Sequence, residues 1–114
     1  MTDALRALSA RGEVAVIGLG ASGSAAARLL ARAGVRVYAS DAGTGEAVVA
    51  TATALRAEGI DAEAGRHDLE RIAAAGHVVV SPGVPPTAPP LVAARAHGVP
   101  VISEIEVALR ALPG

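Results

Sequence analysis

The segment E-V-A-V-I-G-L-G-A-S-G, residues 13–23, joins a short apolar run to glycines spaced G-x-G-x-x-G, and an alanine-rich stretch follows it. A strand, this glycine spacing and a helix in that order predict a phosphate-binding turn. In such a turn Gly18 allows the sharp bend, Gly20 lets the backbone approach a diphosphate, and Gly23 lets the helix pack on the strand. The free amides and the positive dipole end of the helix would face the anion.

An acidic residue closes the second apolar run, V-R-V-Y-A-S, which ends at residue 40. Asp41 stands close to the ~20-residue distance after the glycines that the dinucleotide-binding fingerprint requires. A right-handed βαβ unit brings the end of the second strand beside the first turn. A carboxylate there accepts hydrogen bonds from a nucleotide, usually from ribose hydroxyls, and discourages a phosphate. The alternative is that Asp41 caps the following segment, residues 42–46.

Short apolar runs alternate with helical patterns along the chain, which predicts a Rossmann-like α/β fold with helices on both faces of an open, mostly parallel sheet of about five strands. We expect strands at residues 14–17, 35–40, 61–64, 77–81 and 99–102. We expect helices at residues 22–33, 45–58, 69–74 and 90–97, several of them ended by a left-handed glycine: Gly34, Gly59, Gly76 or Gly98.

A last helix is expected from Ser103, where S-E-I-E has the spacing of a capping box. The capping box accounts for Ser103 and Glu106 without any ligand. Glu104 and Glu106 are therefore interpreted as mainly structural residues.

Length and composition narrow the class of protein. The 114 residues suit one domain, and ten basic against eleven acidic residues give a net charge of -1. Tyr38 is the only aromatic residue, so the chain lacks both the basic stripe and the stacking side chains that nucleic-acid binding uses. No apolar run approaches the ~20 residues that cross a bilayer, and residues 1–11 lack the long apolar stretch of a signal peptide. We expect a cytoplasmic protein with no nucleic-acid and no membrane partner.

The sequence contains no cysteine, which excludes disulfides, thiolate metal sites and cysteine nucleophiles. The three histidines, His67, His77 and His97, lack the i, i+4 spacing of a helical metal pair. They are interpreted as surface or capping residues, and no metal site is expected.

The loop S-P-G-V-P-P-T-A-P-P, residues 81–90, follows a fully apolar strand. Ligands of open parallel sheets bind outside the carboxyl ends of the strands, where the strand order reverses. Prolines fix the backbone and Gly83 permits unusual dihedral angles, so the loop is stiff and can approach a ligand closely. Ser81, Pro82 and Gly83 are candidate site residues. The alternative is a rigid connector that binds nothing.

Three features in this order, G-L-G-A-S-G at residues 18–23, Asp41, and S-P-G followed by S-E-I-E, resemble the N-terminal domain of the Mur ligases over about residues 14–109. The resemblance is strongest to the member that adds D-glutamate. It implies an ATP-dependent ligase of cytoplasmic peptidoglycan precursor synthesis, in which this domain binds the UDP part of UDP-N-acetylmuramoyl-L-alanine.

The resemblance also implies which residues bind the UDP part. The diphosphate would bind to the glycine turn and the amides that follow it. Asp41 would contact the uracil, and the S-P-G loop would line the uridine side of the site. The implied set is Gly18, Leu19, Gly20, Ala21, Ser22, Gly23, Asp41, Ala42, Ser81, Pro82 and Gly83. Ala42 replaces a hydroxyl residue frequent in the family, and Ala21 is smaller than usual.

In the family, ATP and Mg²⁺ bind to a central domain and the incoming amino acid to a C-terminal domain. This sequence has no G-x-x-G-K-[ST] loop and no lysine at all. We therefore expect an excised or separately encoded substrate-binding domain that holds no catalytic residue, binds no cofactor, is inactive alone and has the missing central and C-terminal domains as partners. Two alternatives stay open, the NAD(P)-binding domain of a dehydrogenase and a stand-alone nucleotide-sensing module.

Overall fold

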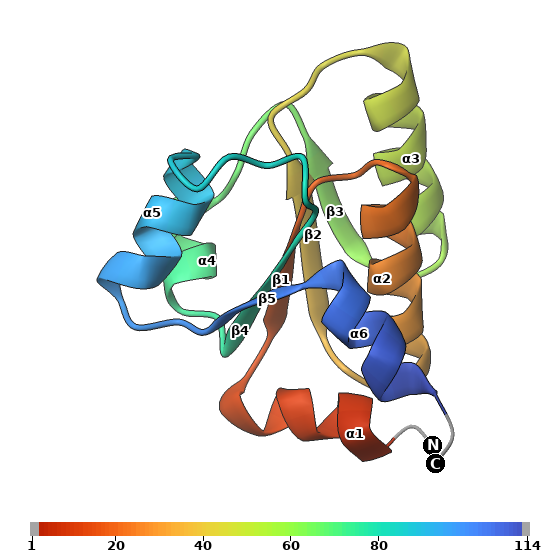
Figure 1. Ribbon diagram of the computed structural model, residues 1–114. Helices are drawn as coiled ribbons and strands as arrows, with labels where there is room; N and C mark the ends of the chain where they lie inside the picture. Colours follow the sequence, from red (N-terminus) through yellow and green to blue (C-terminus); the bar gives the residue numbers. More distant parts are fainter. Residues whose placement is uncertain (1–2, 113–114) are drawn as a thin grey trace.

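The computed structural model describes residues 3–112, which fold around a five-stranded sheet in which all strands are parallel (Figure 1). The strands are β1 (Val14–Ile17), β2 (Val37–Asp41), β3 (Asp61–Ala64), β4 (His77–Val80) and β5 (Val101–Ser103), in the order β3-β2-β1-β4-β5. The order reverses beside β1, whose neighbours are β2 and β4. The predicted Rossmann-like fold is confirmed.

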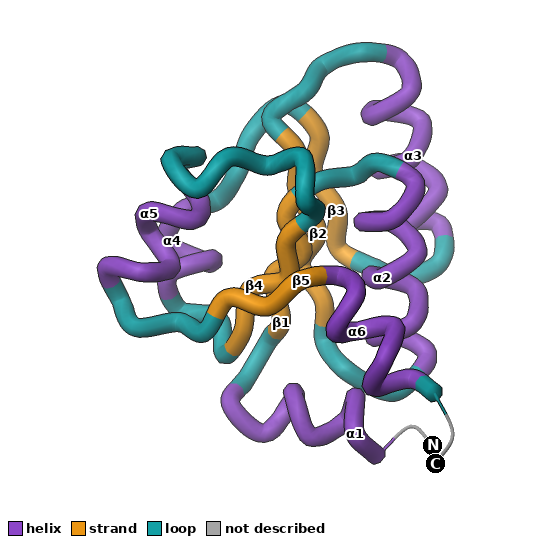
Figure 2. Tube along the Cα trace, in the orientation of Figure 1, coloured by secondary structure: helices purple, strands orange, loops and turns teal. Residues whose placement is uncertain are grey.

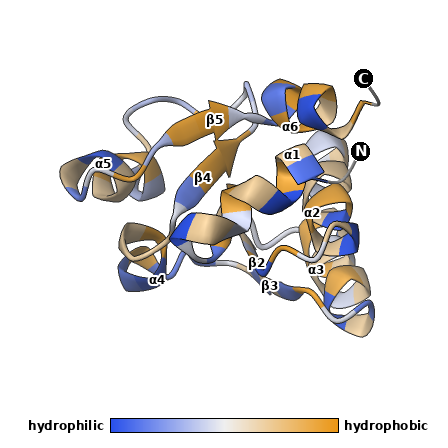
Figure 3. Ribbon diagram, turned by 90° about the horizontal axis from the view of Figure 1, so that it is seen from below, coloured by the Kyte–Doolittle hydropathy of each residue, from blue (hydrophilic) through white to orange (hydrophobic). Residues whose placement is uncertain are grey.

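Helices cover both faces of the sheet (Figures 1 and 2). One face carries α2 (Ala21–Arg32), α3 (Glu46–Ala57) and α6 (Glu104–Ala111), and the other carries α4 (Leu69–Ala73) and α5 (Pro89–Ala96). Viewed from below, the largely hydrophobic strands β4 and β5 lie between these two groups of helices (Figure 3). Among residues 3–112, no helix has the length and apolar character needed to span a bilayer.

The core is divided by the sheet because successive side chains of a strand point to opposite faces. In β1, Val14 and Val16 belong to the cluster packed with α2, α3 and α6, whose fully buried members include Leu30, Leu55 and Val107. The alternate positions Ala15 and Ile17 belong to a second cluster with Tyr38, Ile72 and Leu91. Both faces of β1 are therefore apolar, as expected for a central parallel strand.

Two strands begin later than predicted, for local reasons. β2 starts at Val37 instead of residue 35, since the Val35 amide donates to the Leu30 carbonyl and closes the end of α2. β5 starts at Val101 instead of residue 99, since Pro100 has no amide to donate to a ladder.

The short helices α1 (Asp3–Arg6) and η1 (Ala7–Arg11) were not predicted from the sequence. They bury Leu5 and Leu8 beneath the sheet, each 2% exposed. The prediction for Gly76 was wrong: its backbone is not left-handed, unlike that of Gly34, Gly59 and Gly98. A Cβ at Gly76 would lie 2.7 Å from backbone atoms of Arg11, so this glycine is needed for close chain approach.

Candidate functional site

The glycine turn follows β1 at the point where the strand order reverses. Gly18 has φ +107°, a conformation that favours glycine, and its amide donates to the Ser40 carbonyl at 2.8 Å. A Cβ on Gly23 would lie 2.0 Å from the Gly18 carbonyl oxygen, so α2 starts in direct contact with the turn. Around Gly20 nothing would lie within 4 Å of an added Cβ. Gly18 thus makes the predicted bend and Gly23 the predicted close contact, while the approach of a diphosphate at Gly20 stays a prediction that the open space there would allow.

The first turn of α2 presents unused amides. Gly20 is the N-cap and no side chain caps the helix. Within residues 3–112, the amides of Gly20, Ala21, Ser22 and Gly23 make no hydrogen bond, whereas the Ser24 amide donates to the Gly20 carbonyl. Gly20, Ala21 and Ser22 are exposed. This end of the helix can accept an anion through its amides.

The Asp41 carboxylate fixes the turn from the end of β2. One oxygen, Oδ2, accepts from the amide of the buried Leu19 at 2.9 Å, and Oδ1 accepts from the Gly43 amide at 2.8 Å. Asp41 therefore holds its own loop, as the capping alternative suggested, although the N-cap of α3 is Gly45. A carboxylate has about four lone-pair positions, so Asp41 can still accept hydrogen bonds from a ligand.

The S-P-G loop approaches the glycine turn. Ser81 Oγ would lie 3.3 Å from a Cβ on Gly18 and 3.5 Å from one on Gly23. The Ser81 hydroxyl donates to Glu104 Oε2 at 2.8 Å, at the start of α6. Glu104 was interpreted as mainly structural, and the structure gives it a specific contact, because its carboxylate supports the S-P-G loop. Ser103 does cap α6, accepting from the Glu106 amide at 3.2 Å.

A cavity of about 310 Å³ opens at the carboxyl ends of the strands. Its walls are mostly apolar and come from Ile17 and from the proline-rich loop and the start of α5. Four predicted site residues line it, namely Gly18, Asp41, Ala42 and Gly83. Pro82 is exposed and does not line the cavity. Leu19, Gly23 and Ser81 support the turn from behind, while Gly20, Ala21 and Ser22 lie at the helix end.

His67 also lines this cavity, although sequence analysis interpreted it as a surface or capping residue. Its Nδ1 lies 2.8 Å from Ser40 Oγ, and Ser40 is fully buried. Burial lowers the pKa of His67, and the nearby Asp41 carboxylate opposes that shift. No spacing in the sequence could have revealed His67, because its partner lies 27 positions away.

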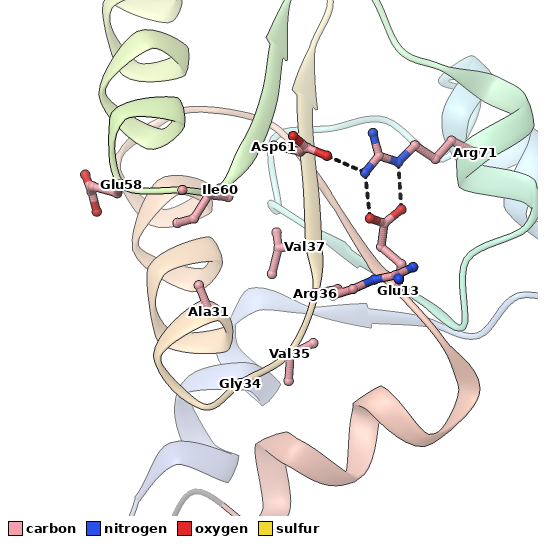
Figure 4. Close-up of a pocket in the computed structure, with 11 residues that line it drawn as sticks. Glu13, Ala31, Gly34, Val35, Arg36, Val37, Glu58, Ile60, Asp61 and Arg71 are labelled. Carbon is pink, nitrogen blue, oxygen red and sulfur yellow. Dashed lines mark hydrogen bonds and ion pairs between the residues drawn. The ribbon is translucent and has the colours of Figure 1, made fainter.

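A larger cavity, of about 690 Å³, lies at the amino ends of the strands (Figure 4). Three of its charged residues are paired with one another: Arg71 donates to both oxygens of Glu13, at 2.7 and 2.6 Å, and to Asp61 at 2.7 Å. The same guanidinium lies 4.4 Å from the ring centroid of Tyr38. Parallel sheets bind ligands at the opposite, carboxyl edge, so the smaller cavity is the candidate site despite its size.

The residues present do not fit an ATP–Mg²⁺ site. The sequence supplies no lysine and no phosphate loop of the G-x-x-G-K-[ST] type. The part of the chain that the structure describes contains no group of three or more histidine, aspartate or glutamate side chains arranged to hold a metal.

The doubly wound parallel sheet, with an open glycine turn at its switch point, defines a Rossmann-like α/β domain. The family model described as "Mur ligase MurD-like, N-terminal domain" matches residues 12–103. The chain belongs to that family.

Curated relatives agree with this assignment. A UDP-N-acetylmuramoylalanine--D-glutamate ligase from Acidobacterium capsulatum is 46% identical over 102 residues, which are 90% of this chain and 22% of the relative. One from Chlorobaculum parvum is 50% identical over 95 residues, 83% of this chain and 20% of the relative. The chain therefore spans about a fifth of the length of these relatives.

A solved structure is similar as well, that of a pseudomurein peptide ligase type C from Methanothermus fervidus. The TM-score is 0.70 at 28% sequence identity, over 86% of this chain and 20% of that one.

Proposed function

We propose that this chain is the domain that binds the UDP part of UDP-N-acetylmuramoyl-L-alanine, in a ligase that joins D-glutamate to that substrate. The proposal rests on one arrangement: free helix-terminal amides stand beside an apolar cavity whose acidic residue is held in place. The names of the curated relatives supply the substrate and the reaction. ATP, Mg²⁺ and the amide-forming step belong to ligase domains outside this chain.

The diphosphate is assigned to the start of α2. Its unused amides at Ala21, Ser22 and Gly23 would donate to phosphate oxygens, and the helix dipole favours negative charge there. No arginine is needed for this contact, which suits a domain of net charge -1. The open space at Gly20 leaves room for the anion to reach the backbone.

The uridine is assigned to the cavity beyond the turn. The carboxylate of Asp41 repels phosphate but accepts hydrogen bonds from a neutral base or from ribose hydroxyls. Proline-rich walls offer flat apolar surface to a ring, and Gly83 and Ala42 keep the cavity open through their small size. The Asp41 carboxylate therefore defines a subsite for a neutral group, and the free amides at the start of α2 define a neighbouring subsite for an anion.

Two other ligands suit parts of the same geometry. A nicotinamide dinucleotide would also use the glycine turn and Asp41. A nucleotide-sensing module would bind similar ligands and change its assembly state. The preference among ligands distinguishes these functions.

The deciding experiment is a calorimetric titration with UDP-N-acetylmuramoyl-L-alanine, with UDP, UMP, NADH and NADPH in parallel. We expect binding of the uridine ligands, weaker for UMP than for UDP because UMP lacks the second phosphate. Preference for NADH would overturn the proposal in favour of a dehydrogenase domain. A ligand-dependent dimer in sedimentation would favour the sensing module.

A further inference from the structure

His67 lines the cavity assigned to uridine, yet the proposed function gives it no task. We propose that His67 is a specificity-determining residue, whose Nε2–H donates to a uracil carbonyl oxygen while Asp41 accepts from the N–H of the ring. This inference rests on the proposed function, since it names how the base is distinguished in that site.

The loop that carries His67 is fastened to β2. The Gly65 amide donates to the Asp41 carbonyl at 2.8 Å, and Asp41 and Arg66 form an isolated antiparallel bridge. On the far side of His67, the Asp68 amide donates to the Tyr38 hydroxyl at 2.9 Å. The imidazole therefore stands beside Asp41 in a fixed position before any ligand binds.

The contact with Ser40 decides which nitrogen carries the proton. Ser40 is fully buried, and a buried hydroxyl without an acceptor is costly. The Tyr38 hydroxyl is nearby, but it already accepts from Asp68 and donates to Glu63 at 2.6 Å. Among the described contacts of the Ser40 hydroxyl, the one to His67 Nδ1 meets hydrogen-bond geometry, so we assign Ser40 as its donor and place the ring hydrogen on Nε2.

The free ring nitrogen is then a neutral donor. Burial lowers the pKa of His67, so the ring is uncharged near pH 7 despite the opposing effect of Asp41. A neutral imidazole is a poor anchor for phosphate but a suitable partner for a carbonyl oxygen.

An acceptor at Asp41 and a donor at His67 match the edge of uracil, which presents a ring N–H beside a carbonyl. Cytosine presents an unprotonated nitrogen beside an amino group, so it would meet acceptor with acceptor and donor with donor. The pair therefore predicts discrimination between two pyrimidines of equal size.

The test titrates the wild type, His67→Ala, His67→Gln and His97→Ala with UDP and with CDP. Removing one neutral hydrogen bond should weaken UDP binding about three- to tenfold and reduce the UDP over CDP preference by a similar factor. His67→Gln keeps an N–H donor and should recover part of that preference. His97→Ala is the matched control, since His97 is exposed on α5's end and should change neither ligand.

Several results would overturn the inference. Unchanged UDP binding in His67→Ala, or an equal loss for UDP and CDP, would leave His67 with a supporting role only. A wild type that prefers NADH would instead reject the proposed function itself, and the inference with it. If His67→Ala does not fold, a two-bond ¹H–¹⁵N spectrum of the wild type decides: a hydrogen on Nδ1, or an Nε2–H signal unmoved by UDP, contradicts the assignment.

Discussion

Gly20 and Gly23 belong to one motif, but the chain surrounds them differently. Gly20 has φ -72°, an ordinary value for any residue, and open space in the direction of a side chain. Gly23 is buried against the carbonyl of Gly18. Gly20 is therefore dispensable for folding, whereas Gly23 is not.

Substitution of these two glycines should separate binding from stability. Gly20→Val should lower the free energy of unfolding by no more than about 1 kcal/mol, since only the cap preference changes, while UDP affinity falls at least about tenfold because the side chain blocks the diphosphate. Gly23→Ala should cost about 3 kcal/mol of stability, because its Cβ would overlap the Gly18 oxygen. Urea denaturation and calorimetry measure the two effects.

Gly45→Val is the control for Gly20→Val. Gly45 is also an N-cap with extended backbone and open surroundings, but it starts α3 and does not line the cavity. It should keep UDP affinity. Equal affinity of Gly20→Val and the wild type would reject the diphosphate position.

Residues whose position in the fold follows from local spacing could be predicted. Gly18, Gly23 and Asp41 could be predicted because a strand, a turn and a helix fix their positions relative to one another. His67 and Glu104 were not recognised as cavity-supporting residues, since their partners Ser40 and Ser81 are distant in sequence and become neighbours only in the sheet.

At the scale of elements, one phenol group is among the contacts that hold the segment between β3 and α4 to β2. Tyr38 in β2 donates to Glu63 and accepts from the Asp68 amide, and its hydroxyl is the hydrogen-bonding link between β2 and the start of α4. Burial, with Glu63 beside it, raises the pKa of Tyr38 to about 12, so the hydroxyl keeps its hydrogen at neutral pH.

Tyr38→Phe should therefore destabilise the protein by about 1–2 kcal/mol, because the partly buried Asp68 amide loses its acceptor while the ring stays in the core. Amide exchange should accelerate most in residues 65–68. Thr51→Val removes a hydroxyl from an exposed contact in α3 and should change stability little. Uniform acceleration of exchange throughout the sheet would argue against a local role.

Elements were predictable where a pattern is long or repeated. All five strands and the five helices from α2 to α6 were expected, because apolar runs and helical stretches alternate. The four- and five-residue helices α1 and η1 carry too few turns to show a helical period. They exist because Leu5 and Leu8 gain burial under the sheet, which only the folded chain provides.

At the scale of the whole molecule, Arg71 links three distant parts of the chain. It bridges α4 to Glu13 before β1 and to Asp61 at the start of β3. The Glu13 side chain is only 13% exposed, so its carboxylate oxygens have little access to water and take their hydrogen bonds from Arg71.

Arg71→Leu should lower the free energy of unfolding by about 2 kcal/mol, less than for a fully buried pair because Arg71 itself is 34% exposed. Arg28→Leu is the matched control: Arg28 also donates through Nε and Nη2 to a carboxylate, Glu58, but that carboxylate is 44% exposed. It should leave the melting temperature unchanged. Equal losses in both variants would show that burial of Glu13 is irrelevant.

Stability should also fall as the pH decreases from about 6.5, the ordinary histidine pKa. Burial lowers the pKa of both His67 and His77, so the unfolded chain binds more protons than the folded one in this range. The pKa values of Glu58 and Glu63 are lowered as well, but they change the free energy of unfolding only below about pH 4.5. Denaturation at pH 7.5 and 5.5 measures the effect, and the double variant H67Q/H77Q should flatten it.

The sheet separates two apolar clusters that share no side chain. Substitutions on opposite faces should therefore combine additively, and repacking beneath α4 and α5 need not disturb the packing around α2. Over evolutionary time, the residues of the cluster beneath α4 and α5 can therefore change while the cluster around α2 keeps the glycine turn in place. Members of this family can then vary the residues that line the cavity without changing the start of α2, where the anion is proposed to bind.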